Sequence, residues 1–234
     1  MQALQGLVFD KDGTLFDFHA SWGEWSAGFI DDLALNDART AAALSEALGF
    51  RLAERRFEPT SPMIAGTMEV LLEAVLRIVP DWEPAALRSH ILASTAAAKQ
   101  VPPVPLVRLL DRLRRAGLTL GVATNDAEEP ARAHLCEAGV LSHFDFVAGY
   151  DSGHGAKPGP GMLLAFCDST GLTPSDCAMI GDSRHDLLSG RAAGMQTIAV
   201  LTGLAAEGEL ADLADVVVED IGRIPDLLAL PDSG

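Results

Sequence analysis

Acidic side chains follow two short apolar runs of this chain. Asp10 and Asp12 come directly after the first run, GLVF, and Asp182 and Asp186 come after a later run, CAMIG. A carboxylate can attack a phosphoryl group and form an aspartyl-phosphate, and a second acid nearby can protonate the leaving alcohol. Carboxylates gathered at one point repel one another unless a cation joins them, and such oxygen ligands suit Mg²⁺. The pattern therefore indicates phosphoryl-transfer chemistry at a magnesium site.

Side chains that could hold a phosphate occur at two further places. Thr124 and Asn125 end the apolar run LTLGVAT, and Lys157 lies in the loop sequence GAKP. A lysine ammonium and a threonine hydroxyl can stabilise the equatorial oxygens of a transferred phosphoryl group. Taken alone, Thr124 would be a helix N-cap and Lys157 a solvated surface lysine. The functional interpretation is favoured because ligands of open α/β sheets bind beyond the carboxyl ends of the strands.

Short apolar runs alternate with helical patterns from about residue 104 to the end of the chain. Continuous apolar runs predict strands that are buried on both faces, as in a parallel sheet. Each helical pattern stops at a glycine, which favours a helix end. The alternation predicts an α/β fold with a doubly wound parallel sheet. The predicted strands are 6–10, 118–124, 144–148, 177–181, 197–201 and 215–218, and the predicted helices are 104–116, 128–138, 161–170 and 184–193.

The stretch between the first strand and residue 101 has a different composition. It is rich in Ala, Leu, Glu and Arg, shows no clear strand, and predicts helices over 37–53, 67–79 and 83–99. The run VPPVP at 101–105 is typical of a linker that returns the chain to the sheet. We therefore expect an α/β core domain, residues 1–16 and 101–234, and a small all-helical domain, residues 17–100, inserted after the first strand.

Composition and charge restrict the expected partners. The 234 residues are 48% hydrophobic, enough for a substantial core, and carry a formal net charge of -16. A surface of that sign repels nucleic acid and anionic lipid, so neither is an expected partner. We find no signal peptide and no apolar run long enough to span a bilayer. Cys136, Cys167 and Cys177 are widely spaced, which predicts no disulfide framework and favours a reduced, cytoplasmic protein.

Four motifs, found in order, resemble those of the haloacid dehalogenase superfamily. The run FDKDGTL at 9–15 is similar to the first motif, and the strand end Thr124-Asn125 to the second. Lys157-Pro158 is similar to the third motif, and the run GDS at 181–183 with the later Asp186 to the fourth. The resemblance covers the whole chain, and the organisation is similar to that of phosphoglycolate phosphatases. It implies that the inserted domain is a cap that closes over small soluble substrates.

The resemblance also implies catalytic and phosphate-binding roles. Asp10 would be the nucleophile, and Asp12 would act as general acid and then as general base. Thr124, Asn125 and Lys157 would hold the phosphate. Dehalogenases and phosphonatases lack an acid two residues after the nucleophile, so Asp12 favours a phosphatase over either of them.

A magnesium site follows from the same resemblance. Mg²⁺ would bind the Asp10 carboxylate, the Asp12 backbone carbonyl and Asp182, with Asp186 close by. Lys11 lies between the two key acids, and it receives no role because many relatives carry an apolar or variable residue there.

The function expected from the sequence is a Mg-dependent phosphatase that hydrolyses small phosphate monoesters through an aspartyl-phosphate intermediate. Its substrate would be phosphoglycolate-like or a sugar phosphate, so the expected partner is a small phosphorylated metabolite. Two alternatives stay open: a phosphomutase of the β-phosphoglucomutase type, and a non-catalytic regulatory or binding protein. A monomer and a homodimer are both compatible with the sequence.

Overall fold

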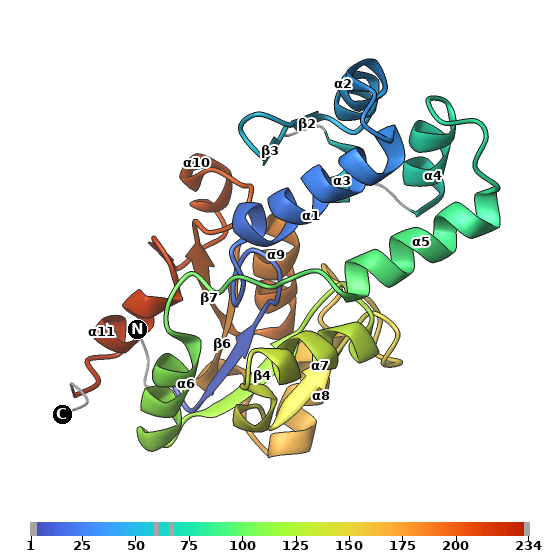
Figure 1. Cartoon of the computed structure of the whole chain (residues 1–234). Coiled ribbons are helices and arrows are strands. Elements are labelled where there is room, and N and C mark those ends of the chain that lie inside the picture. Colours follow the sequence, from blue (N-terminus) through green and yellow to red (C-terminus); the bar gives the residue numbers. More distant parts are fainter. Residues whose placement is uncertain (1–3, 59–60, 66–67, 232–234) are drawn as a thin grey trace. The chain divides into compact units, whose positions relative to one another are not determined.

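The computed structural model describes residues 4–58, 61–65 and 68–231 (Figure 1). The chain divides into two compact units. The core unit comprises the residues up to Phe18 and those from Val101 onward, and the insert unit comprises His19–Gln100. None of the helices in the described ranges combines the length and the hydropathy that a bilayer crossing requires.

A six-stranded sheet forms the centre of the core unit, and every neighbouring pair of its strands is parallel. The strand order is β5-β4-β1-β6-β7-β8, so the first strand lies inside the sheet and the chain winds outward on both sides of it. This order confirms the predicted doubly wound parallel sheet. The strands are β1 (Gly6–Phe9), β4 (Thr119–Ala123), β5 (Phe146–Ala148), β6 (Cys177–Gly181), β7 (Gln196–Val200) and β8 (Val216–Val218).

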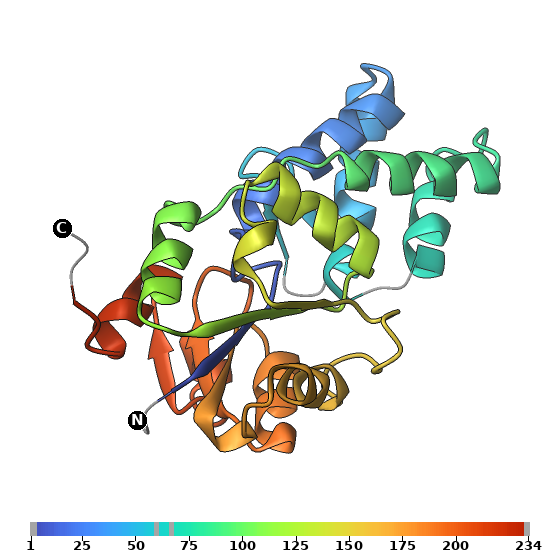
Figure 2. The same ribbon diagram turned by 90° about the horizontal axis from the view of Figure 1, so that it is seen from below.

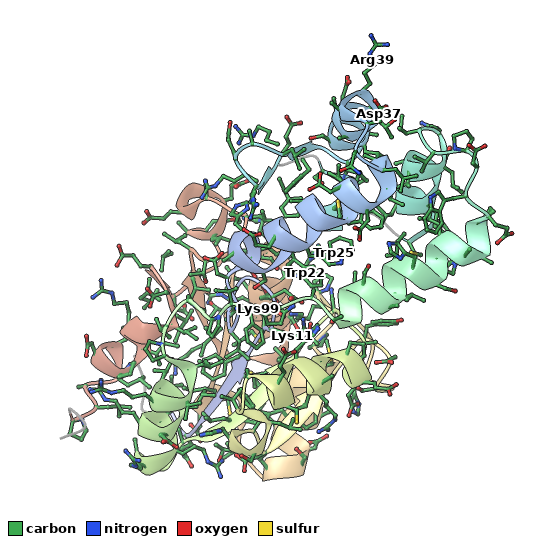
Figure 3. The ribbon with its side chains drawn as sticks, in the orientation of Figure 1. Lys11, Trp22, Trp25, Asp37, Arg39 and Lys99 are labelled. Carbon is green, nitrogen blue, oxygen red and sulfur yellow. The ribbon has the colours of Figure 1, made fainter. Side chains whose placement is uncertain are left out.

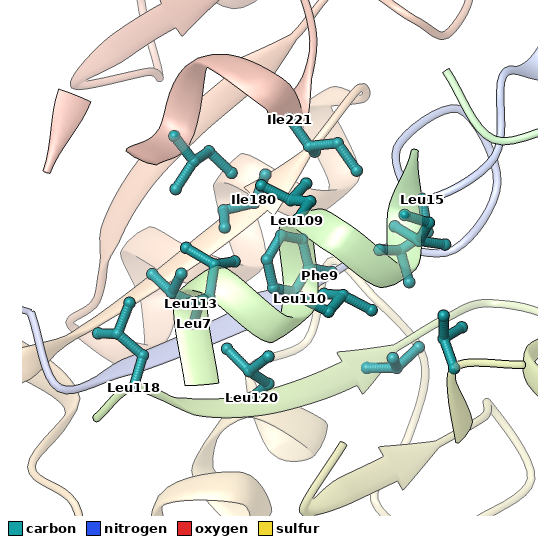
Figure 4. Packing of buried hydrophobic residues seen from close by; sticks show 14 of the residues in the cluster. Leu7, Phe9, Leu15, Leu109, Leu110, Leu113, Leu118, Leu120, Ile180 and Ile221 are labelled. Atoms are coloured by element: carbon teal, nitrogen blue, oxygen red, sulfur yellow. The ribbon is translucent and has the colours of Figure 1, made fainter. Parts of the chain in front are cut away.

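Successive residues of β1 belong to different buried clusters. Leu7 and Phe9 pack with the leucines of α6 (Leu106–Arg115) (Figure 4). Val8 packs instead with Phe166 of α8 (Gly161–Thr170). Strand side chains alternate between the two faces, so both faces of the sheet are covered by helices (Figure 2). Burial on both sides explains why the strands read as continuous apolar runs.

The helices of the core unit end where the glycines of the sequence predict. Gly171 after α8 and Gly194 after α9 (Arg184–Ala193) have φ angles of 71° and 80°, a left-handed conformation that glycine adopts without steric cost. The remaining helical elements of this unit are α7 (Glu128–Glu137), α10 (Glu207–Leu210), α11 (Ile224–Leu227), η1 (Leu141–His143), η2 (Pro174–Asp176) and η3 (Ile221–Arg223).

The insert unit is mainly helical, and two of its helices, α1 (Phe18–Ala34) and α3 (Pro62–Ala65), were not predicted. The helix α1 contains an aromatic cluster in which Trp25 stacks on Phe29, with ring centroids 5.1 Å apart. Phe29 in turn stacks on His90 at 5.9 Å. The other helices are α2 (Ala38–Ala47), α4 (Met68–Leu76) and α5 (Pro84–Ala96). The predicted helix 67–79 began at Thr67, which lies outside the described residues.

A small hairpin corrects the expectation that this stretch contains no strand. The strands β2 (Phe50–Arg51) and β3 (Arg56–Phe57) pair antiparallel, and they replace the end of the helix predicted over 37–53. Gly49, before β2, has a φ of 55°, which a helix cannot continue through. Each strand has only two residues, too few to show the alternation by which strands are recognised in a sequence.

Candidate active site

Three strand ends at the centre of the sheet bring predicted residues together. β4, β1 and β6 are neighbours, and they end directly before Thr124, Asp10 and Asp182. All three of these side chains are buried. Because the strands are parallel, their carboxyl ends meet at one edge of the sheet, where open α/β folds bind ligands.

Lys157 joins two of the predicted acids. Its ammonium nitrogen lies 2.7 Å from Oδ1 of Asp10 and 2.6 Å from Oδ1 of Asp186, and all three residues are buried. Burial alone would lower the pKa of this lysine, but the two carboxylates outweigh burial and raise the pKa of Lys157 above its ordinary value. Lys157 is therefore a fixed positive charge inside the acidic cluster.

Asp186 has a structural contact as well as its contact with Lys157. It is the third residue of α9, and its Oδ2 accepts hydrogen bonds from the backbone N–H of Ser183, at 3.0 Å, and from the Ser183 hydroxyl, at 2.7 Å. Such contacts stabilise the start of a helix. The same side chain thus caps α9 and holds Lys157.

Asn125 fixes the backbone of the loop that carries Lys157. Its Oδ1 accepts from the Lys157 backbone N–H at 2.8 Å, and its Nδ2 donates to the Lys157 carbonyl at 3.0 Å. Thr124 Oγ1 accepts from the backbone N–H of Asp126 at 3.1 Å. The contacts of Asn125 indicate that it positions Lys157, and phosphate binding by Thr124 and Asn125 stays a prediction.

The carboxylates of Asp10, Asp182 and Asp186 form the group that fits a cation. Each offers one oxygen, and these oxygens lie within 4.8 Å of one another. Burial raises the pKa of Asp10 from 3.8 to about 7, even though Lys157 acts to lower it. Burial, and then Asp186 and Asp10, raise the pKa of Asp182 well above its ordinary value. Buried oxygen donors with so little compensating charge suit a hard divalent cation such as Mg²⁺.

Comparison with known proteins assigns the family. The profile of haloacid dehalogenase-like hydrolases matches residues 4–194, which contain every residue of the acidic cluster. The chain belongs to the haloacid dehalogenase-like hydrolases. This result confirms the resemblance found in the sequence and the expectation of a hydrolase.

Two curated relatives of this hydrolase align over nearly its whole length. A probable phosphatase, IndB, from Dickeya dadantii is 32% identical over 97% of this chain and 96% of its own length. A phosphoglycolate phosphatase from Xylella fastidiosa is 31% identical over 97% of this chain and 92% of its own length. Among solved structures, the magnesium-bound hydrolase YfnB of Bacillus subtilis superposes with a TM-score of 0.73 at 16% identity, covering 97% of this chain and 99% of its own.

Two glycines pack against the cluster in this hydrolase: Gly13, which belongs to the first motif, and Gly203, which the sequence analysis did not identify. A Cβ on Gly13 would lie 2.4 Å from the Asp182 carboxyl carbon, and a Cβ on Gly203 would lie 1.7 Å from Asp182 Oδ2. Gly13 also has a φ of 78°, which disfavours any side chain. Backbone from two distant segments therefore packs directly against this carboxylate. No sequence pattern marks Gly203, because its partner is 21 positions away at another strand end.

Lys11 is a charged residue whose surroundings the sequence did not indicate. Its side chain is fully buried, and its ammonium contacts the Asp12 carboxylate at 2.7 Å. The sequence assigned no role to Lys11, and it did not indicate that this side chain is buried against an acid. The sequence could not show this, because two further partners, Asp126 and His134, are brought to Lys11 only by the fold.

Proposed function

We propose that this hydrolase is a Mg²⁺-dependent phosphatase acting on small phosphate monoesters, with Asp10 as the nucleophile. The observation that carries the proposal is the buried group formed by Asp10, Lys157, Asp182 and Asp186 at the central strand ends. It combines a carboxylate that can attack, a fixed ammonium and a set of oxygen ligands for a cation. The names of the relatives, a probable phosphatase and a phosphoglycolate phosphatase, support the same reaction class.

The reaction divides between two carboxyl groups. An Asp10 oxygen attacks phosphorus, the bond from phosphorus to the ester oxygen breaks, and the alcohol leaves with a proton supplied by Asp12. Water then attacks phosphorus, Asp12 takes a proton from that water, and the bond between phosphorus and the Asp10 oxygen breaks. Inorganic phosphate leaves, and both carboxyl groups return to their starting protonation states.

The neighbouring residues would hold the substrate and the metal. Lys157 would neutralise charge on the transferred phosphoryl group, and Asn125 would keep Lys157 in place. Asp10 and Asp182 would bind the metal together with the Asp12 carbonyl, and Asp186 would lie beside it. When bound, Mg²⁺ neutralises negative charge on the phosphoryl oxygens and aligns them with the nucleophile.

We propose a phosphoglycolate-like or sugar phosphate as the substrate, with the insert unit as its cap. Substrates of this size suit a small inserted domain that excludes water from the intermediate. The three cysteines are free thiols, which fits a reducing, cytoplasmic compartment.

A phosphate-release screen tests the proposed function. We expect wild-type protein to release inorganic phosphate from one or more small monoesters, 2-phosphoglycolate and hexose phosphates included, only when Mg²⁺ is present. Conversion of a sugar phosphate to its positional isomer without phosphate release would instead support a mutase. A folded protein that binds Mg²⁺ and neither hydrolyses nor isomerises any ester would support the regulatory alternative.

Magnesium binding should depend on pH through Asp10. The pKa of Asp10 is raised from 3.8 to about 7 in the folded chain. Between these two pH values the Asp10 carboxyl group is therefore protonated in the folded chain and ionised in the unfolded chain. This group therefore makes the metal-free fold less stable as pH rises between those two values. Mg²⁺ must displace the proton, so the increase in melting temperature on adding Mg²⁺ should be larger at about pH 8 than at about pH 6.

Calorimetry of wild type and Asp10→Asn checks this expectation. The pH dependence of the Mg²⁺-induced increase should shrink in Asp10→Asn, which has no proton to displace at this position. Equal increases at both pH values in the wild type would contradict the assignment of Asp10 to the metal site.

A further inference from the structure

A buried lysine lies beside Asp12, the general acid of the proposed reaction. Lys11, which is labelled in Figure 3, is fully buried. Its ammonium lies 2.7 Å from Oδ2 and 2.8 Å from Oδ1 of Asp12. Contact with both oxygens restricts the rotation of the carboxylate far more than one hydrogen bond would. The Asp12 side chain keeps 23% of its surface exposed, so it is held by the protein and still accessible to a ligand.

Two further groups hold Lys11 from neighbouring elements. Asp126, in the loop after β4, places Oδ2 at 3.3 Å from the ammonium, and His134, on α7, places Nδ1 at 3.3 Å. The N–H donors of the Lys11 ammonium therefore face both oxygens of Asp12, Oδ2 of Asp126 and Nδ1 of His134. The loop after β1, the loop after β4 and the helix α7 are therefore joined through the Lys11 side chain.

The state of His134 agrees with this arrangement. A lysine ammonium can only donate, so Nδ1 of His134 must present its lone pair, and the ring must be neutral. Burial, followed by the charge of Lys11, lowers the pKa of His134. For Lys11, burial opposes the charged form, but Asp12 and then Asp126 raise its pKa above the ordinary value. Lys11 is thus a cation, and His134 is a neutral acceptor.

Lysine is rare in this chain, and two of its three lysines are buried. The 17 basic residues include only three lysines, Lys11, Lys99 and Lys157. Lys11 and Lys157 are buried beside the acids of the active site, and Lys99 is exposed in the insert unit. A buried ion pair adds little net stability compared with well-packed apolar side chains. Stability alone therefore gives a weak reason to bury an ammonium at position 11.

We propose that Lys11 is a positioning residue, which holds the Asp12 carboxyl group where it exchanges a proton with the leaving alcohol and with water. The inference rests on the proposed function, because it concerns the proton-transfer step of that reaction. Asp126 and His134 hold Lys11 in turn, so the loops after β1 and β4 act together on Asp12.

The leaving group separates this role from a merely structural one. An alkoxide must be protonated as it leaves, whereas p-nitrophenolate is stable enough to leave without a proton. Misplacing Asp12 should therefore lower kcat/KM, which reports formation of the phosphorylated intermediate, for an alkyl phosphate and leave kcat/KM for p-nitrophenyl phosphate nearly unchanged. A general loss of fold or of metal binding would slow both reactions alike.

The experiment compares Lys11→Met with wild type on p-nitrophenyl phosphate and on the best alkyl phosphate of the screen, in saturating Mg²⁺. For Lys11→Met we expect kcat/KM on the alkyl ester to fall by about 10²-fold, the cost of displacing a catalytic group by about 1 Å. The fall on p-nitrophenyl phosphate should be under about threefold, and Asp12→Asn should show the same selectivity more strongly. Lys99→Met, which removes the exposed lysine, should match wild type on both esters.

A second variant covers the case in which Lys11→Met does not fold. Asp126→Asn keeps the Oδ1 acceptor of the Ala127 N–H and removes only the charge that faces Lys11. It should show the same selective loss, about tenfold on the alkyl ester. Equal losses on both esters, or no loss on either, would overturn the role of Lys11. A wild-type protein that hydrolyses neither ester would contradict the proposed function itself and the role of Lys11 with it.

Discussion

Replacing Asp10 by Asn should reduce phosphate release from every substrate by about 10⁴-fold or more, because the amide cannot form the phosphorylated intermediate. The change keeps the size of the side chain and the Oδ1 acceptor of the Lys11 backbone N–H, at 2.7 Å. It removes a carboxylate whose charged form is disfavoured by burial. The metal-free variant should therefore be at least as stable as wild type at about pH 8.

Steady-state kinetics and thermal unfolding measure the two halves of this prediction. The matched control is Asp168→Asn, which makes the same chemical change at an exposed position of α8 and should leave kcat unchanged. An Asp10→Asn protein that unfolds earlier than wild type without metal would show that the carboxylate is structural. An active variant would exclude Asp10 as the nucleophile.

Replacing Lys157 by Met should damage both stability and activity. Without the ammonium, Asp10 and Asp186 lose a cation that lies within 2.7 Å of each of them. Removing one partner of a buried ion pair costs about 3–5 kcal/mol of unfolding free energy. Losing a cation that faces the phosphoryl group should also lower kcat/KM by about 10²-fold or more.

The stability loss in Lys157→Met should itself depend on pH. Lys157 acts to lower the pKa of Asp10 and Asp182, so both carboxyl groups will protonate more readily when the lysine is absent. Protonated acids no longer repel one another, so the loss of unfolding free energy should be smaller at about pH 6 than at about pH 8. Urea unfolding at both values measures this difference, with Lys99→Met as the control. A loss equal to that of Lys99→Met would contradict the buried charge network.

The apolar runs were sufficient to predict the sheet, because strands buried on both faces carry a continuous hydrophobic signal. They also predicted which residues would meet. Asp10, Thr124 and Asp182 were placed at strand ends, and a parallel sheet brings strand ends to one edge. The catalytic roles of these residues remain predictions, because they come from the family resemblance and not from position alone.

Other features could not be predicted, because their cause lies in contacts between distant segments. Lys11 is a charged residue in a motif position that is often apolar, and its partner His134 is 123 positions away. The three atoms nearest to a Cβ on Gly203 would all belong to Asp182. Asn125 was expected to face the phosphate, yet both ends of its amide contact the Lys157 backbone. The spacing of residues along the sequence does not indicate contacts of this kind.

The central claim is that the phosphoryl group passes through Asp10, and trapping that group tests the claim most directly. Wild-type protein would be mixed with its best phosphate monoester and Mg²⁺, quenched in acid within one turnover, digested, and examined by mass spectrometry. We predict that the peptide containing Asp10 gains the mass of one phosphoryl group, and that hydroxylamine removes it, as expected for an acyl phosphate. Phosphate release within one turnover without any phosphorylated peptide, or with the phosphoryl group on another residue, would contradict this mechanism.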